Sequence, residues 1–356
     1  MSVLDPLSPT TPASTPPLTS APASAWSRRR ALGTLAAGGV AGAALVGAPW
    51  VRAAGGKKLT LSWSGTALCL LPVVVARDRG FFEKNQVDVD VINFSGSTDQ
   101  VLESLATGKA DVSLGLIHSW LKPLESGFDV KVVGAAHAGC IRVLAGQDSK
   151  LSSVDKLKGA VIGVGQPNGF GRQFMSTYLA RKGINPDTEV EWKTYPPDTL
   201  DVAYKKGEIN LIVDADPNLF LIERRNPGQF REIASILTGD FKDRLCCLIA
   251  ARGALVRENR PQVAAAVRSL TEAALFIAEN PGEAAKVALT YLPQKVTAAD
   301  IRSILTTQLG YRHHPQGVAL RNEIEQYAAD LKNVGVLKKS TDPARFASFL
   351  TVDVLG

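Results

Sequence analysis

The sequence predicts an α/β protein made of two similar lobes, and three observations support this prediction. From Lys58 onward, short β-branched runs alternate with helical patterns, which is typical of βα units on parallel strands. The segment SLATGKADVSLGL (104–116) has a counterpart in AYKKGEINLIVDA (203–215), and each contains a helix end, a glycine turn and a short apolar strand. The 356 residues, 45% of them hydrophobic, suffice for about two domains of roughly 150 residues each.

The expected elements follow the same order in both lobes. Alternation of valine with aspartate over 87–91 indicates a half-buried strand, and Gly80 is expected to end the first helix. In the first lobe we expect strands at 59–62, 87–91 and 112–116 and helices at 72–82 and 99–107. In the second we expect strands at 161–164, 190–194 and 211–213 and helices at 171–182 and 199–206. After the strand 245–251, the pattern predicts helices only, at about 261–279, 281–290, 297–307 and 317–332.

A polar segment separates the two lobes in this interpretation. Residues 146–158 carry serines, aspartates and lysines, which suits a linker between lobes. The chain is expected to enter the second lobe near residue 147 and to return near 245. Residues 57–146 and 245–356 then form a discontinuous lobe 1, residues 147–244 form lobe 2, and two strands make the hinge.

The N-terminal sequence indicates a leader that takes no part in the fold. Residues 1–26 are rich in Pro, Ser, Thr and Ala and are expected to be disordered. Paired arginines at 28–30, an uncharged run over 31–48 and small residues at 53–54 together indicate a twin-arginine signal peptide, cleaved near Ala53 or Ala54. A retained membrane anchor is the alternative, although the five glycines of that run suit a membrane span poorly. The prediction is a periplasmic protein with the twin-arginine translocase as its export partner.

Charge and motifs exclude several classes of function. The formal net charge is +6, and residues 1–53 carry half of it through four arginines and one aspartate. The remaining chain has no Lys/Arg run or basic aromatic patch, so nucleic acid is not an expected partner. It also lacks a P-loop, a nucleophile elbow and an HExxH motif, so no catalytic residue is predicted.

Several segments, in their order along residues 58–350, resemble a known family. They are LPVVVARDRGFFEK (71–84), Gly96-Ser97-Thr98 before a helix ending in LATGKADV (105–112), DKLKG (155–159) before a strand, and Leu337-Lys338-Lys339 with Asp342-Pro343. The chain is similar to the nitrate/sulfonate/taurine solute-binding proteins of ABC importers (SsuA/THI5-like, NMT1-like) and to the related thiamine-pyrimidine synthases.

The resemblance implies a type II periplasmic binding protein fold, a ligand held between the lobes and hinge closure on binding. It also implies an ABC permease and ATPase as partners, a non-enzymatic role and no cofactor. The expected solute is small and polar, such as a sulfonate, nitrate or an organic nitrogen compound of the thiamine-pyrimidine type. A metal- or thiol-dependent protein, including a THI5-like synthase, is the alternative.

Polar loops at the carboxyl ends of the expected strands supply the candidate ligand contacts. Hydroxyls and backbone N–H groups at helix starts suit an anion, whereas the two acids after the strand 211–213 suit an amine or amidine. Each of these residues could instead cap a helix. The candidates are Ser64, Gly65, Thr66, Ser95, Gly96, Ser97, His118, His137, Asn168, Gly169, Asp214 and Asp216.

The four cysteines are all expected near the region between the lobes. Cys140 precedes the outgoing crossover and Cys246-Cys247 begin the returning strand, so Cys140 could meet either of them. Three interpretations remain open: a disulfide from Cys140 to Cys246 or Cys247, buried free thiols, or a transition-metal or thiol-reactive site that adds His137. Cys69 follows the first strand. No CxxC pair with zinc-ribbon spacing is present.

Overall fold

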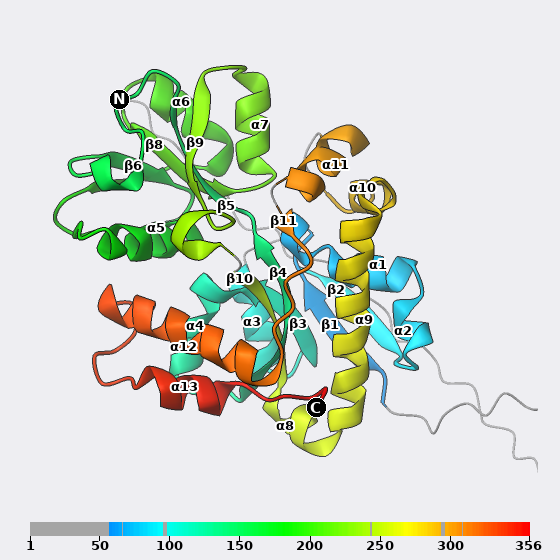
Figure 1. The fold of residues 1–356 in the computed structure, drawn as a ribbon. Helices are drawn as coiled ribbons and strands as arrows, with labels where there is room; N and C mark the ends of the chain where they lie inside the picture. The colour runs from blue at the N-terminus through cyan, green and yellow to red at the C-terminus, as the bar shows by residue number, and fades with distance from the viewer. Residues whose placement is uncertain (1–56, 66, 95–97, 243, 293–295, 308) are drawn as a thin grey trace, which may run out of the picture. The chain divides into compact units, whose positions relative to one another are not determined.

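The computed structural model describes residues 57–356 except 66, 95–97, 243, 293–295 and 308. The leader, the signal peptide and the cleavage position therefore lie outside the described residues. Two mixed sheets organise the described chain (Figure 1). Lobe 1 contains a sheet in the order β11-β4-β10-β3-β1-β2, and lobe 2 contains a sheet in the order β7-β6-β8-β5-β9.

The strands of lobe 1 are β1 (Leu59–Trp63), β2 (Val89–Asn93), β3 (Val112–Leu116), β4 (Val130–Gly139), β10 (Leu245–Arg252) and β11 (Leu309–Gly310). Those of lobe 2 are β5 (Ile141–Gly146), β6 (Val161–Val164), β7 (Glu191–Thr194), β8 (Leu211–Ala215) and β9 (Phe230–Ser235). The short strand β11 was not expected, because the pattern after 251 predicts helices only. A two-residue strand is too short to produce a period in the sequence.

Both sheets have one plan. Without the edge strand β11, the orders β2-β1-β3-β10-β4 and β7-β6-β8-β5-β9 match position by position. The first three strands of each run parallel, and the fourth, β10 or β5, is antiparallel to both its neighbours. Each of these antiparallel strands arrives directly from the other lobe. The predicted repeat is confirmed, because 104–116 ends in β3 and 203–215 ends in β8, which hold equivalent places.

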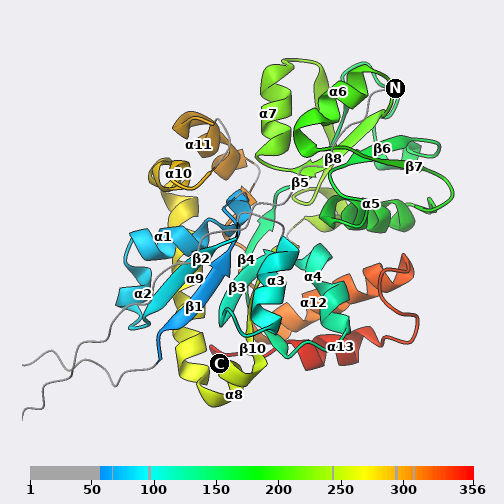
Figure 2. The ribbon, with the colours of Figure 1, turned by 180° about the vertical axis from the view of Figure 1, so that it is seen from behind.

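Helices cover both faces of the lobe 1 sheet. The helix α9 lies in front of that sheet in Figure 1, whereas α3 and α4 lie in front of it when the protein is seen from behind (Figure 2). The helices of lobe 1 are α1 (Pro72–Asp78), α2 (Phe81–Lys84), α3 (Thr98–Ala106), α4 (Ile117–Glu125), α8 (Gly253–Glu258), α9 (Arg260–Glu279), α10 (Pro281–Leu289), α11 (Ala298–Thr307), α12 (Gly317–Asn333) and α13 (Pro343–Leu350). Lobe 2 contributes α5 (Phe170–Arg181), α6 (Leu200–Lys205) and α7 (Asn218–Arg225).

Most expected elements are present with small shifts, and the helix expected at 72–82 is divided. Gly80 has a φ of +72°, a left-handed conformation that a glycine adopts without strain, and it separates α1 from α2. Five elements between 117 and 235 were not anticipated: α4, β4, β5, α7 and β9. The strands β4 and β5 are buried along nearly their whole length, so they lack the alternation that marks a half-buried strand.

The outgoing crossover lies earlier than expected. The strand β4 ends at Gly139 in the lobe 1 sheet, and β5 begins at Ile141 in the lobe 2 sheet. Residues 141–146 therefore belong to lobe 2, and the polar segment 146–158 is a connection from β5 to β6 within that lobe rather than a linker between lobes. The return passes through η4 (Gly239–Phe241) to β10, which begins at Leu245 as expected.

The two lobes share a continuous apolar core. One cluster of buried residues extends from β1 and β10 of lobe 1 to β5, β6 and α5 of lobe 2. A second, smaller cluster lies on the other side of the lobe 2 sheet, under α6 and α7. Ion pairs from α5 and α7 to α12 and α11 also join the lobes: Arg181–Asp330 at 2.7 Å and Arg224–Asp300. Among the helices of the described chain, none combines the length and hydropathy that crossing a membrane requires.

Candidate functional site

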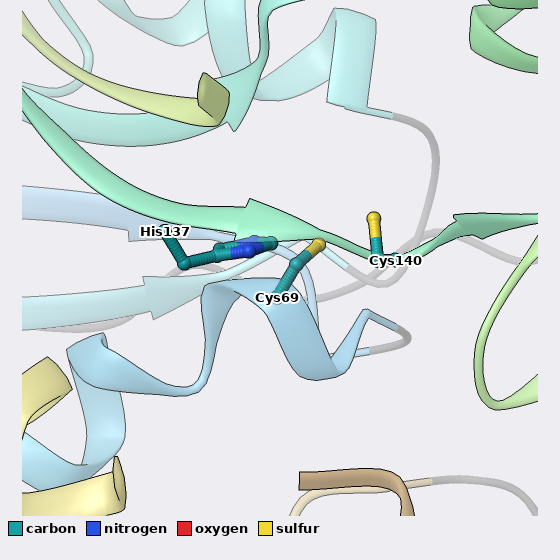
Figure 3. A group of neighbouring side chains, drawn as sticks. All are labelled: Cys69, His137 and Cys140. Carbon is teal, nitrogen blue, oxygen red and sulfur yellow. The ribbon is translucent and has the colours of Figure 1, made fainter. Parts of the chain in front are cut away.

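Five buried side chains gather where the chain crosses between the lobes. Cys69 lies in η1 (Leu68–Leu70), His137 lies in β4, and Cys140 is the crossover residue between β4 and β5. Cys246 and Cys247 lie in β10, just after the returning crossover. All five are at most 2% exposed. We call these five residues the crossover cluster; Figure 3 shows Cys69 reaching the His137 ring, with Cys140 on the adjoining crossover.

Irregular backbone aims these side chains at one another. Successive residues of a regular strand point to opposite faces, so Cys246 and Cys247 could not share a site in an ideal strand. The pairing of β10 with β4 shifts register between Leu245 and Cys247 and again after Cys247, an irregularity of the kind that redirects side chains. Cys247 lies opposite His137 across this ladder. Cys140 has a φ of +88°, which is rare for a residue with a Cβ.

The side chains of the crossover cluster lie close enough together to be possible ligands of one metal ion. The ligand atoms of Cys69, His137 and Cys140 lie within 4.8 Å of one another, and so do those of His137, Cys246 and Cys247. The sulfur atoms of Cys140 and Cys246 are 3.3 Å apart. All four cysteines are free thiols in this structure, and Cys140 and Cys246, one of the two pairs considered for a disulfide, are in contact.

The imidazole of His137 is held in one orientation. Its Nδ1 donates a hydrogen bond to the carbonyl of Ala138 at 2.5 Å, and its ring lies 5.2 Å from that of Tyr311. The Nε2 atom is buried and has no hydrogen-bond partner among the described residues. Burial acts to lower the pKa of His137, but the thiols of Cys69 and Cys246 outweigh it and hold that pKa above its usual value.

Thiolate character concentrates on two of the four cysteines. Hydrogen bonds with Cys140 and Cys247 hold the pKa of Cys69 well below its usual value. Burial acts to raise the pKa of Cys246, but hydrogen bonds from Cys140 and Cys247 and the nearby His137 outweigh it and lower the pKa to about 5. The hydrogen bond with Cys246 is the main reason that the pKa of Cys140 rises well above its usual value. The crossover cluster can thus hold a thiolate beside neutral thiols, which is the starting state of a metal site or of thiol chemistry.

Asp214 presents an unpaired oxygen at the end of β8. Its Oδ1 accepts hydrogen bonds from the backbone of Ala215 and from Asn218, whereas its buried Oδ2 has no partner among the described residues. Burial raises the pKa of this carboxyl to about 6. A Cβ added to Gly165 would lie 3.2 Å from Oδ2, so the glycine leaves room beside that oxygen. An N–H group of a solute would satisfy it.

Asp216, the second predicted acid, already has partners. Its two carboxylate oxygens accept hydrogen bonds from Arg142 at 2.8 Å each, and Oδ1 also accepts one from the backbone N–H of Phe220. Arg142 further pairs with Glu223 and Glu232. A ligand contact at Asp216 would have to compete with this ion pair, which sequence reasoning missed because Arg142 lies 74 residues away.

His118 is fully buried between two aromatic rings. It lies in the first turn of α4 and meets Phe174 of α5 and Tyr327 of α12 edge-on, with ring centroids 5.8 and 5.0 Å away. Neither ring nitrogen has a hydrogen-bond partner in the described chain. Burial, together with the nearby Arg244, lowers the pKa of His118 to about 3, so the imidazole is neutral.

The other candidates are spread along the strand ends. Ser64 is buried after β1, and the backbone N–H of Gly65 donates to Asn93 at 2.8 Å. Gly169 precedes α5, and Asn168 is exposed. Thr66, Ser95, Gly96 and Ser97 lie outside the described residues. The structure therefore brings His137 together with Cys140, Cys246 and Cys247. It adds Cys69 to this group, and the position of Cys69 after the first strand was the sequence signal that could have placed it there.

Comparison with known proteins now identifies the family. The model of the NMT1/THI5-like family matches residues 69–284, more than half of the chain. The chain belongs to this family. No curated protein gives a significant match.

Solved structures share the fold at low identity. The aliphatic sulphonate-binding protein SsuA of Escherichia coli is 15% identical with a TM-score of 0.67, over 82% of this chain and 97% of that one. The nitrate-binding protein NrtA of Synechocystis PCC 6803 is 16% identical with a TM-score of 0.66, over 84% and 86%. SsuA of Xanthomonas axonopodis pv. citri, bound to MOPS, is 17% identical with a TM-score of 0.63, over 83% and 99%. The predicted type II periplasmic binding protein fold is confirmed.

Proposed function

We propose that this protein is the periplasmic solute-binding component of an ABC importer and that it binds its solute between the lobes by hinge closure. The observation that carries the proposal is the strand order that the two lobes share. Each lobe also receives one strand directly from the other lobe, through one of two adjacent crossovers. Polar loops follow the strands of both lobes, and ligands of open α/β sheets bind beyond such strand ends.

The solute is small and polar, and Asp214 narrows its chemistry. A carboxyl oxygen that is buried without a partner favours a solute with an N–H donor, because an unsatisfied buried acceptor is unfavourable. An organic nitrogen compound, such as a pyrimidine or an aminosulfonate, meets this requirement better than nitrate or a simple alkanesulfonate does. The sulfonate- and nitrate-binding proteins of the same fold support the general class of solute.

Export and partners follow from this role. The proposal includes a permease and an ATPase as transport partners and export by the twin-arginine route, with cleavage near Ala53 or Ala54. Its support is the pair of arginines at 28–29 before an uncharged run. Replacement of both arginines by lysine should leave the protein uncleaved in the cytoplasm, which fractionation and mass analysis of the N-terminus would measure.

A thermal-shift screen of the protein recovered from the periplasm tests the binding role. Aminosulfonates, alkanesulfonates, nitrate and aminopyrimidines form the panel, and a true solute at about 100 times its Kd should add about 2.7 kcal/mol to the unfolding free energy. The matched variant Asp214→Asn should lose affinity for the N–H donors while keeping any response to nitrate. Absence of a shift with every compound at millimolar concentration would contradict the proposal.

A further inference from the structure

We propose that the crossover cluster binds one thiophilic cation with a filled d shell, Zn(II) or Cu(I), through four ligands drawn from His137 and the thiolates of Cys69, Cys140, Cys246 and Cys247. The residues of this site are separate from the solute contact proposed above, because none of them is Asp214.

The donor set fits this class of ion. Thiolate sulfur and imidazole nitrogen are the ligands that zinc and copper(I) prefer, and a filled d shell imposes no geometry of its own. In a tetrahedral site with Zn–S bonds of about 2.3 Å, two sulfurs lie roughly 3.8 Å apart. The Cys140–Cys246 separation of 3.3 Å and the 4.8 Å limit within each group bracket that value. Small side-chain movements therefore suffice to close four ligands around one ion.

The side chain of His137 has the orientation that is typical of a metal-binding histidine. Metal-binding imidazoles commonly donate their second N–H to a backbone carbonyl, which fixes the tautomer and points the free lone pair at the metal. His137 donates from Nδ1 to Ala138, and this leaves Nε2 as the lone-pair atom. That atom is buried and has no hydrogen-bond partner among the described residues. A ring nitrogen of His137 lies within 4.8 Å of the cysteine sulfurs of both groups.

Three unrelated segments depart from regular structure at the same point. The register of β10 shifts around Cys247, the chain takes a positive φ at Cys140, and η1 places Cys69 beside them. Such departures cost energy and concentrate at functional sites. Aliphatic side chains in regular strands would fill this part of the core without an unpaired nitrogen, so packing alone does not explain the arrangement.

Metal binding would act on the hinge. Cys140 is the single residue between β4 and β5, and Cys246 and Cys247 open the strand that returns from lobe 2. An ion shared by these residues would tie the two crossovers to each other and to η1 of lobe 1. Its occupancy would therefore restrict the change in backbone angles that lobe closure needs.

Metal analysis of the full-length chain, purified anaerobically under reducing conditions, tests the proposal. After incubation with Zn(II) or Cu(I) and removal of free metal, elemental analysis should find one equivalent per chain. Competition with a chelator for each ion decides between the two. Cobalt(II), added as a spectroscopic probe, should give the intense absorption of thiolate-to-cobalt charge transfer.

Variants and spectroscopy make the test decisive. Cys140→Ser and Cys247→Ser should weaken binding by more than about 100-fold, beyond the roughly 10–100-fold typical of losing an outer-shell partner. The control His313→Gln removes an imidazole outside the crossover cluster and should retain one equivalent. Because a serine variant could fold poorly, X-ray absorption on the wild-type protein should independently count mainly sulfur and one nitrogen around the ion. Binding well below one equivalent, equal affinity in the serine variants, or a shell of oxygen and nitrogen would overturn the proposal.

Discussion

Two buried polar regions of this protein differ in how completely their groups are paired. In lobe 2, the guanidinium of Arg142 is 3% exposed and contacts the carboxylates of Asp216, Glu223 and Glu232. Where the lobes meet, His118 and His137 leave ring nitrogens without partners in the described chain. The unpaired Oδ2 of Asp214 belongs with this second group, although it lies in lobe 2.

The difference separates support of the fold from readiness to bind. A buried charge whose partners are all present holds its neighbours in place and has little left to offer a ligand. A buried donor or acceptor without a partner lowers stability unless something else satisfies it. The paired network is therefore expected to respond to substitution as a structural element. The unpaired groups should respond in ways that depend on pH, metal or solute.

Arg142→Met should produce the largest effect on stability. It leaves Asp216 buried without its cation, and loss of one partner of a buried pair lowers the unfolding free energy by about 3–5 kcal/mol. Urea denaturation followed by circular dichroism at pH 7 measures this. The control Arg257→Met removes an exposed ion pair with Asp129 and should change little. Similar losses in the two variants would show that the buried network is not a special source of stability.

His118→Leu should change how stability responds to acid. Burial holds the pKa of His118 near 3, so below about pH 6.5 the unfolded chain binds a proton that the native state does not. Stability conferred by this neutral imidazole is therefore lost as the pH falls. Between pH 7 and 4 the wild type should lose about 3 kcal/mol more than the variant. Parallel pH curves from urea titrations would contradict this assignment.

Asp214→Asn should have an effect of similar size and opposite sign. The native carboxyl has a pKa of about 6, above its unfolded value, so the wild type loses stability as the pH rises from about 4 to 6. The variant should gain about 3 kcal/mol at pH 7 and nothing below pH 4. Asp201→Asn is the matched control: its hydrogen bonds with Arg225 hold the pKa of Asp201 near 2, so its stabilising effect disappears in acid. Equal trends in both variants would be inconsistent with this explanation.

Local patterns of the sequence determined much of the fold. The strands β3 and β6 have the predicted bounds, and the repeat of a helix end, a glycine turn and an apolar strand established two lobes of one plan. These features depend on side-chain period, on glycine at positive φ and on short β-branched runs, all of which act over a few residues. The pattern also placed Cys140 and Cys246-Cys247 at the crossovers.

Contacts between distant segments decided the rest. The position of the crossover, at Cys140 rather than near 147, depends on which sheet each strand enters. The pairing of Asp216 with Arg142 and the addition of Cys69 to the crossover cluster join residues about 70 or more positions apart. A mainly apolar run such as 130–146 is compatible with one strand or two. Only packing against β10 on one side and β8 on the other divides it at Gly139 and Cys140. The sequence thus determined the chemistry available at the hinge, and the tertiary structure decided which of those groups meet.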